Sequence, residues 1–208
     1  MAIDKSLFWY GKIYHIHTDP QMKEARNHIL NLILEKSRVF DAGCGTGALA
    51  LFLREKANCR VVGADLSLKQ IDFAKKTNTY DDVDFLHMDI TDITEYEKYE
   101  DNSFDYSLMC QVFYMLPSNK RLEVLAELMR IAKNTIIVDI NAPLPNNLLG
   151  LAIRILQPIL GRSHYDNFKS YRASGGITGI LKSAGLESNI SRGFTFKHNC
   201  QQIVLLAR

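Results

Sequence analysis

Residues 39–51 have the sequence VFDAGCGTGALAL. The apolar run at the start predicts a buried strand over 37–42, and the run at the end predicts a helix over 46–57. Between them lie Gly43, Gly45 and Gly47. Glycine has no side chain, so the backbone can turn sharply here and lie close to a ligand. The first amide groups of the helix then face the turn and favour a negatively charged group.

Two acidic residues follow the next two predicted strands. Asp65 ends the strand over 59–65, and Asp89 follows the strand over 83–88. At the carboxyl edge of such a sheet, a carboxylate at Asp65 can accept both hydrogen bonds from a ribose diol, and Asp89 is placed to contact an adenine edge. The alternative is that each acid only caps the turn or helix that follows, although Ser67 is better placed than Asp65 for that role.

A dinucleotide such as NAD is a second possible ligand for the glycine loop, because Gly43-x-Gly45-x-x-Ala48 satisfies the looser dinucleotide pattern. Three features argue against it. Asp41 would place a negative charge beside a pyrophosphate, whereas it suits a ligand with an ammonium group. A long helix predicted over 20–36 precedes the first strand, and the chain ends in a predicted hairpin.

Composition sets the broad class of the protein. The 208 residues are 47% hydrophobic and 23% charged, which is typical of a globular chain of one domain. The net charge of +2 argues against a dedicated nucleic-acid-binding protein. The four cysteines form no zinc or disulfide pattern, so we expect a reducing, cytoplasmic compartment and no metal site. No secretory signal is visible, and the longest apolar stretch is too short to span a bilayer.

The order of apolar runs predicts an α/β fold with a seven-stranded, mostly parallel sheet. Five predicted strands, over 37–42, 59–65, 83–88, 103–110 and 134–140, alternate with predicted helices over 46–57, 67–76 and 118–132. A last helix over 176–184 leads into strands near 186–194 and 200–207. The connection between these two strands is so short that they must be antiparallel.

We expect one domain over residues 1–208. Its parts are an N-terminal arm and helix (1–36), a cofactor-binding core (37–141), a cap insert (142–172), and a last helix with a terminal β-hairpin (173–208).

Four segments together resemble the ordered motifs of class I S-adenosylmethionine-dependent methyltransferases. They are VFDAGCGTGALAL, VVGADLS (61–67), FLHMDITD (85–92) and NSFDYSLMCQVFYML (102–116). The resemblance implies a Rossmann-like three-layer sandwich with an antiparallel last strand, and S-adenosylmethionine as the cofactor, which leaves as S-adenosylhomocysteine. The general look is similar to the small-molecule branch that includes ubiquinone, menaquinone and phospholipid methyltransferases.

The resemblance also implies roles for residues of the motifs. Asp41 and the loop residues would hold the methionine portion of the cofactor, Asp65 with Leu66 the ribose, and Asp89 with Ile90 the adenine. The loop residues are Gly43, Cys44, Gly45 and Gly47. At the end of the fourth strand, Cys110 and Gln111 would lie near the sulfonium.

The catalytic residues are less clearly marked than the cofactor site. A hydroxyl or carbon acceptor would need a base, usually histidine, whereas an amine or thiolate needs little acid–base help. His15 and His17 lie beside Tyr14 in an N-terminal segment, and His164 and Tyr165 lie in the insert. The resemblance implies that the N-terminal segment closes over the cofactor, where Tyr14 would contact the sulfonium. The alternative for this aromatic residue is packing of the arm.

Within the insert, residues 146–162 (NNLLGLAIRILQPILGR) predict one apolar helix. Its apolar face is wide enough to cover a hydrophobic pocket or to touch a membrane surface, or it packs as an ordinary cap. Only Arg154 and Arg162 are basic, so strong attraction to anionic lipid is not expected.

We therefore expect methyl transfer to a small, amphipathic or apolar acceptor. One alternative is a lipid or quinone methyltransferase at the membrane surface, and another is a protein that binds S-adenosylmethionine without turnover.

Overall fold

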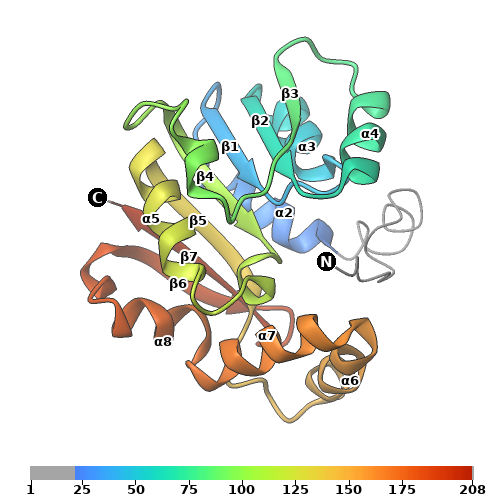
Figure 1. Cartoon of the computed structure of the whole chain (residues 1–208), viewed down its shortest axis with the longest axis vertical. Coiled ribbons are helices and arrows are strands. Elements are labelled where there is room, and N and C mark those ends of the chain that lie inside the picture. Colours follow the sequence, from blue (N-terminus) through green and yellow to red (C-terminus); the bar gives the residue numbers. More distant parts are fainter. Residues whose placement is uncertain (1–21, 208) are drawn as a thin grey trace.

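A computed structural model describes residues 22–207. Seven strands form one sheet in the order β3-β2-β1-β4-β5-β7-β6 (Figure 1). The strands are β1 (Arg38–Ala42), β2 (Arg60–Asp65), β3 (Val83–His87), β4 (Phe104–Cys110), β5 (Ala132–Ile140), β6 (Ile190–Phe196) and β7 (Gln201–Ala207). β1 to β5 are parallel, and β7 is antiparallel to both β5 and β6. The predicted α/β fold with a closing hairpin is confirmed.

Helices cover both faces of the sheet, so the molecule has three layers. Side chains of α2 (Lys23–Leu30), α3 (Ala48–Ala57) and α4 (Leu68–Thr77) form the core on one face. Side chains of α5 (Arg121–Ile131), α7 (Arg162–Ala173) and α8 (Gly176–Ser183) form the core on the other. Each fully buried leucine or isoleucine in these cores contributes about 1.5–3 kcal/mol to folding.

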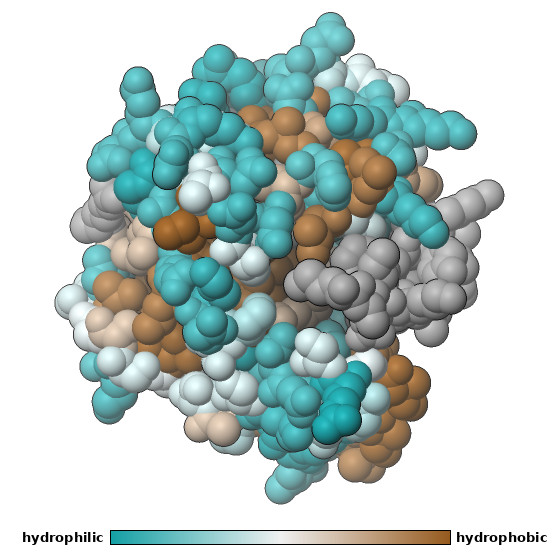
Figure 2. All heavy atoms as spheres, in the orientation of Figure 1, coloured by the Kyte–Doolittle hydropathy of each residue, from teal (hydrophilic) through white to brown (hydrophobic). Residues whose placement is uncertain are grey.

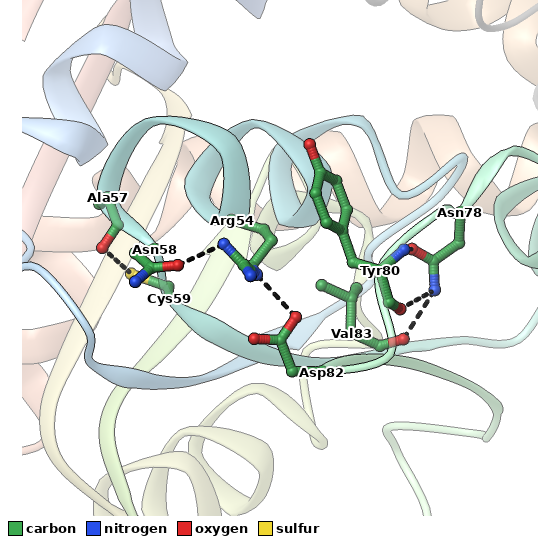
Figure 3. A network of polar contacts seen from close by, with 8 residues as sticks. All are labelled: Arg54, Ala57, Asn58, Cys59, Asn78, Tyr80, Asp82 and Val83. Carbon is green, nitrogen blue, oxygen red and sulfur yellow. Dashed lines mark hydrogen bonds and ion pairs between the residues drawn. The ribbon is translucent and has the colours of Figure 1, made fainter.

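The two edges of the sheet differ in their loops. At the amino edge, a polar network joins the end of α3 to the loop before β3 (Figure 3). In this network Arg54 Nε lies 2.6 Å from Asp82 Oδ1, and Asn78 Nδ2 donates to the carbonyl of Val83 at 2.8 Å. At the carboxyl edge lie the glycine loop and the ends of β2, β3 and β4. Because parallel strands share this edge, motifs that are far apart in the sequence meet there.

The helix predicted over 20–36 is wrong in length. α2 ends at Leu30, and the chain turns before β1 although Leu32 and Ile33 continue the apolar spacing. The turn is stabilised because Lys36 has a φ of 62° and donates its N–H to Ala57 at 2.8 Å. The predicted start of this helix, at residue 20, lies outside the described residues.

The single helix predicted over 146–162 is also wrong, because the cap is divided. α6 spans Leu148–Leu156, and a 3-10 helix over Gln157–Leu160 follows it. Pro158 lacks an N–H and so disfavours continuation of the α-helix. Gly161, with a φ of 119°, then redirects the chain into α7, which the sequence did not predict.

The next-to-last strand begins later than predicted, because a 3-10 helix over Glu187–Asn189 precedes β6. Lys197, His198 and Asn199 all have positive φ in the turn to β7. All four cysteines are free thiols. None of the helices within residues 22–207 has the length and apolar character to cross a membrane.

Candidate functional site

A cavity of about 470 Å³ lies along the carboxyl edge of the sheet. It runs from the ends of β2 and β3 to the turn between β6 and β7, and the cap covers part of it. Eight residues expected to bind the cofactor line it, namely Gly43, Gly45, Asp65, Leu66, Asp89, Ile90, Cys110 and Gln111. Three others, Asp41, Cys44 and Gly47, do not line it, and Tyr14 lies outside the described residues.

The glycine loop is fastened to β2 by its own backbone. Gly43 and Cys44 both donate their N–H groups to the carbonyl of Ala64, at 2.7 and 3.0 Å, and Gly45 N donates to Asp65 Oδ2 at 2.9 Å. These three loop amides are therefore engaged within the protein and are not open to an anion. The glycine at position 43 lets the loop backbone pack closely against Val112, because a Cβ on Gly43 would lie 2.4 Å from Val112 Cγ2.

Asp65 joins the loop to the next helix. Its Oδ2 accepts from Gly45 N, and its Oδ1 accepts from Ser67 N at 2.8 Å. Burial raises the pKa of Asp65, although these two hydrogen bonds partly offset the effect. Ser67 caps α4 by accepting from Gln70 N, as predicted. Each carboxylate oxygen has further lone pairs, so Asp65 can still accept hydrogen bonds from a diol in the cavity.

Asp89 lies at the outer end of the same half of the cavity. Its Oδ1 accepts from Thr91 N and Thr91 Oγ1, at 2.9 and 2.7 Å. The side chain therefore caps a turn, as one of the two alternatives expected, and it also lines the cavity. The neighbouring Ile90 is buried and gives this end an apolar wall.

Asp41 lies behind the cavity wall, with 1% of its surface exposed. Burial and the nearby Asp65 carboxyl raise the pKa of Asp41 to about 7. Among the described residues, nothing makes a hydrogen bond to its Oδ2. A buried carboxylate without a partner is costly, and a cation close to it would remove that cost.

The end of β4 forms the floor between the two halves of the cavity. Gln111 has a φ of 60°, which is uncommon for a residue with a side chain, and its N–H donates to the carbonyl of Val138 at 2.7 Å. Its Nε2 is buried and has no partner among the described residues. Burial, with the nearby Asp41, raises the pKa of the Cys110 thiol, which therefore stays protonated.

The other half of the cavity is largely apolar. The loop after β4 contributes Tyr114, Met115, Leu116 and Pro117, and the cap contributes Leu149, Ala152, Ile153, Leu156 and Leu160. These side chains exclude water from the space beside Gln111.

A buried polar network holds the loop after β4 in place. Arg121, which is 2% exposed, donates to the carbonyl of Asn167, and Asn167 Nδ2 donates to the carbonyl of Met115, both at 2.7 Å. Asp139 accepts from Tyr114 N at 3.0 Å. Burial raises the pKa of Asp139 to about 7, although its hydrogen bonds and the Arg121 charge act against this.

The structure does not bring His164 or Tyr165 to the cavity wall. His164 Nε2 lies 2.5 Å from Oε1 of Gln157, which does line the cavity. The ring of Tyr165 faces Lys169, whose Nζ is 4.9 Å from the ring centroid. His15 and His17, the other two proposed bases, lie outside the described residues.

Three lining residues that sequence reasoning missed come from the terminal hairpin, and they are Lys197, Cys200 and Gln201. Their signal in the sequence is indirect. A last strand that runs antiparallel must begin at the carboxyl edge, so the residues of the preceding turn reach the cavity.

Comparison with known proteins shows similarity to methyltransferases. Residues 39–135 match the family model described as a methyltransferase domain. Over 102 residues the chain is 32% identical to a protein of Bacillus subtilis (strain 168) that is named a methyltransferase, YqeM. The match covers 48% of this chain, which spans about two fifths (39%) of the length of that curated relative.

Solved structures show the same fold. A SAM-dependent methyltransferase from Aquifex aeolicus is 20% identical, with a TM-score of 0.64 over 94% of this chain and 97% of that one. PH0226 from Pyrococcus horikoshii OT3 is 19% identical, with a TM-score of 0.66 over 90% and 89%. Magnesium protoporphyrin IX methyltransferase (ChlM) from Synechocystis PCC 6803, solved with bound SAH, is 18% identical, with a TM-score of 0.62 over 93% and 84%.

Proposed function

We propose, from the premise that residues 39–135 match the family model of a methyltransferase domain, that this chain transfers a methyl group from S-adenosylmethionine to a small acceptor with an apolar body. One observation carries the proposal. A single cavity joins an acidic half, beside the glycine loop and Asp65, to an apolar half under the cap. The first half suits a cationic nucleoside, and the second suits an apolar acceptor.

The residues of the acidic half fit this cofactor. Asp41 lies behind the wall of this half, where the positive charge of an amino-acid ammonium in the cavity would stabilise its unpartnered carboxylate, and Asp65 would hold the ribose hydroxyls. Asp89 and Ile90 would flank the adenine. Bound S-adenosylmethionine supplies an activated methyl on a positively charged sulfur, which leaves as a neutral thioether.

The chain's own contribution is then to align the acceptor and exclude water. No histidine belongs to the described residues that line the cavity, and the raised pKa of Cys110 keeps that thiol neutral. We therefore propose an acceptor that is nucleophilic without a protein base, with its proton passing to solvent.

Calorimetry with S-adenosylhomocysteine, S-adenosylmethionine and NAD tests the cofactor assignment. We expect saturable binding of the first two and none of NAD. Turnover is tested by incubating metabolite extracts with methyl-labelled cofactor and searching for labelled small molecules. Binding without any labelled product in polar, apolar and lipid fractions would favour a binding protein without turnover.

A second candidate, an acceptor taken from a lipid surface, is favoured by the outer face of the cap. Leu148 is 88% exposed and Ile159 is 70% exposed, and Leu151 and Ile155 are each at least half exposed. Figure 2 shows hydrophobic side chains gathered at the lower right, where α6 lies in Figure 1. Sedimentation with neutral liposomes separates the candidates. Pelleting that Leu148→Ser and Ile159→Ser abolish would support the lipid version, and a chain that stays in the supernatant would contradict it.

A further inference from the structure

The cavity has a polar end that the cofactor assignment does not use. It is formed by Lys197 and Gln201, where the hairpin turns into β7. In the sheet order, β7 is separated from β2, which carries Asp65, by four strand spacings of roughly 4.8 Å each. The end at Lys197 and Gln201 and the end at Asp65 are therefore far enough apart to contact different molecules, or different parts of one molecule, bound in the cavity.

Gln201 is the more informative residue of this end. It pairs with Ile140 of β5 and Phe196 of β6, so its backbone position is fixed by two neighbouring strands. Only 7% of its surface is exposed, and its Oε1 has no hydrogen-bond partner among the described residues. A buried carbonyl without a donor is unfavourable, and a ligand that brings an O–H or N–H removes the penalty.

The adjacent Gln202 provides an internal comparison. It is 9% exposed, and its Oε1 also has no partner among the described residues. Because side chains alternate along a strand, Gln202 faces the opposite side of β7, and it does not line the cavity. Of these two glutamines, only Gln201 combines an unsatisfied carbonyl with access to the space where an acceptor would lie.

The charge at this end adds a second constraint. Lys197 is the one cationic residue among the described residues that line the cavity, and the acids Asp65 and Asp89 lie at the other end. A neutral or anionic group is therefore preferred beside Lys197, and a cationic group is disfavoured.

We propose that Gln201 determines acceptor specificity by accepting a hydrogen bond from the acceptor. The acceptor class is an apolar molecule that carries, besides its nucleophilic atom, a neutral or acidic O–H or N–H such as a phenol group, and its apolar body lies against Leu149, Ile153 and Leu156 of α6. The proposal rests on the proposed function, because it places the acceptor in the half of the cavity that S-adenosylmethionine leaves open.

Binding of three matched probes to the full chain saturated with S-adenosylhomocysteine tests the proposal. The probes are 4-butylphenol, its methyl ether 4-butylanisole, and the cationic 4-butylbenzylamine. We expect the phenol to bind about tenfold more tightly than the other two, as one hydrogen bond allows. Gln201→Leu should remove the preference over the ether, and Gln202→Leu should keep it.

Both leucine variants should fold, since each removes an unsatisfied buried oxygen, and their thermal midpoints and S-adenosylhomocysteine affinities serve as controls. Equal binding of phenol and ether to the unmodified chain, or a preference that survives Gln201→Leu, would overturn the proposal. So would the absence of phenol binding to the loaded chain. Failure of S-adenosylhomocysteine to bind at all would instead overturn the proposed function, so the two failures are distinguishable.

Discussion

The polar groups of Figure 3, at the amino edge of the sheet, and three buried polar atoms at the carboxyl edge differ in whether they have hydrogen-bond partners. At the amino edge, Asn78 uses both ends of its side-chain amide, accepting from Tyr80 N at 2.9 Å and donating to two carbonyls (Figure 3). Arg54 pairs with Asp82 and lies over the Tyr80 ring, 5.0 Å from its centroid. These groups satisfy one another and hold turns together.

At the carboxyl edge, three buried polar atoms lack such partners. Asp41 Oδ2 near the end of β1, Gln111 Nε2 just after β4 and Gln201 Oε1 at the start of β7 make no hydrogen bonds to the described residues. Unpaired buried polar groups make this edge of the sheet less stable than paired groups would. A ligand that pairs with them on binding restores the lost stability. The contrast predicts that changes at the carboxyl edge alter binding, whereas changes at the amino edge alter only stability.

The largest expected effect comes from Gly43→Ala. The added methyl would meet Val112 at 2.4 Å, at a φ of 80° that favours glycine. Strain and overpacking together cost about 2–5 kcal/mol, and Val112 is pushed toward the cavity. We expect loss of S-adenosylhomocysteine binding by calorimetry and a lower unfolding midpoint.

Gly185→Ala is the matched control for that change. Gly185 has a φ of 71°, but a Cβ there would meet nothing within 4 Å. The control should lose about 1–2 kcal/mol of stability and keep its affinity for the cofactor. If both variants bind S-adenosylhomocysteine normally, the glycine loop is not part of the cofactor site.

The sequence predicted those parts of the site that depend on one strand and the turn after it. The glycine loop, Asp65 and Asp89 each follow a strong apolar run, and parallel strands place all such turns at one edge. Asp41 was identified too, but its burial behind the wall depends on how β1 packs between β2 and β4, which no local pattern contains.

The missed residues depend on tertiary arrangement. Gln201 reaches the cavity only because β7 inserts between β5 and β6. His164 was a reasonable choice in the insert, yet the division of the cap at Pro158 places Gln157 between its ring and the cavity. Periodicity reports which face of an element is apolar, but it does not report which element lies next to it.

The second prediction concerns pH and the buried carboxyl of Asp41. Its pKa is raised to about 7 by burial and by Asp65, from 3.8 in an unfolded chain. The unfolded chain therefore releases a proton that the folded chain retains, and the free energy of unfolding falls as pH rises from about 4 to about 7, by about 1 kcal/mol per pH unit. Urea unfolding at several pH values measures this. Because the pKa of Asp139 is also raised to about 7, Asp41→Asn should make the fall shallower without abolishing it.

Asp105 at the amino edge is the comparison for this titration. Its burial opposes ionisation, but hydrogen bonds from Arg38 N and Lys133 lower its pKa overall. Asp105→Asn should leave the fall between about pH 5 and about pH 7 intact, because this carboxyl is ionised throughout that range in both states. If Asp41→Asn and Asp105→Asn changed the pH profile equally, this would contradict the opposite pKa shifts assigned to the two carboxyls.

The third prediction is that Asn78→Ala destabilises the fold without affecting the cofactor. Its amide donates to the carbonyls of Tyr80 and Val83 at 3.0 and 2.8 Å and closes the turn before β3. Loss of these bonds from a partly exposed site should cost about 1–2 kcal/mol in urea unfolding. The affinity for S-adenosylhomocysteine should not change, and a tenfold loss would show that the turn and the cavity are coupled.

The smallest effect is expected for Asp82→Asn. The ion pair with Arg54 is short, but about a quarter of the Arg54 side chain and a third of the Asp82 side chain are exposed, so water screens the charges. Arg54 also keeps its contacts with Asn58 and the Tyr80 ring when the charge of Asp82 is removed. We expect a loss of about 0.5 kcal/mol at low salt that disappears at high salt, measured by urea unfolding. A loss of stability that persists at high salt would mean that Asp82 acts through its hydrogen bond rather than its charge. The amino edge would then depend on exact hydrogen-bond geometry, as the cavity does.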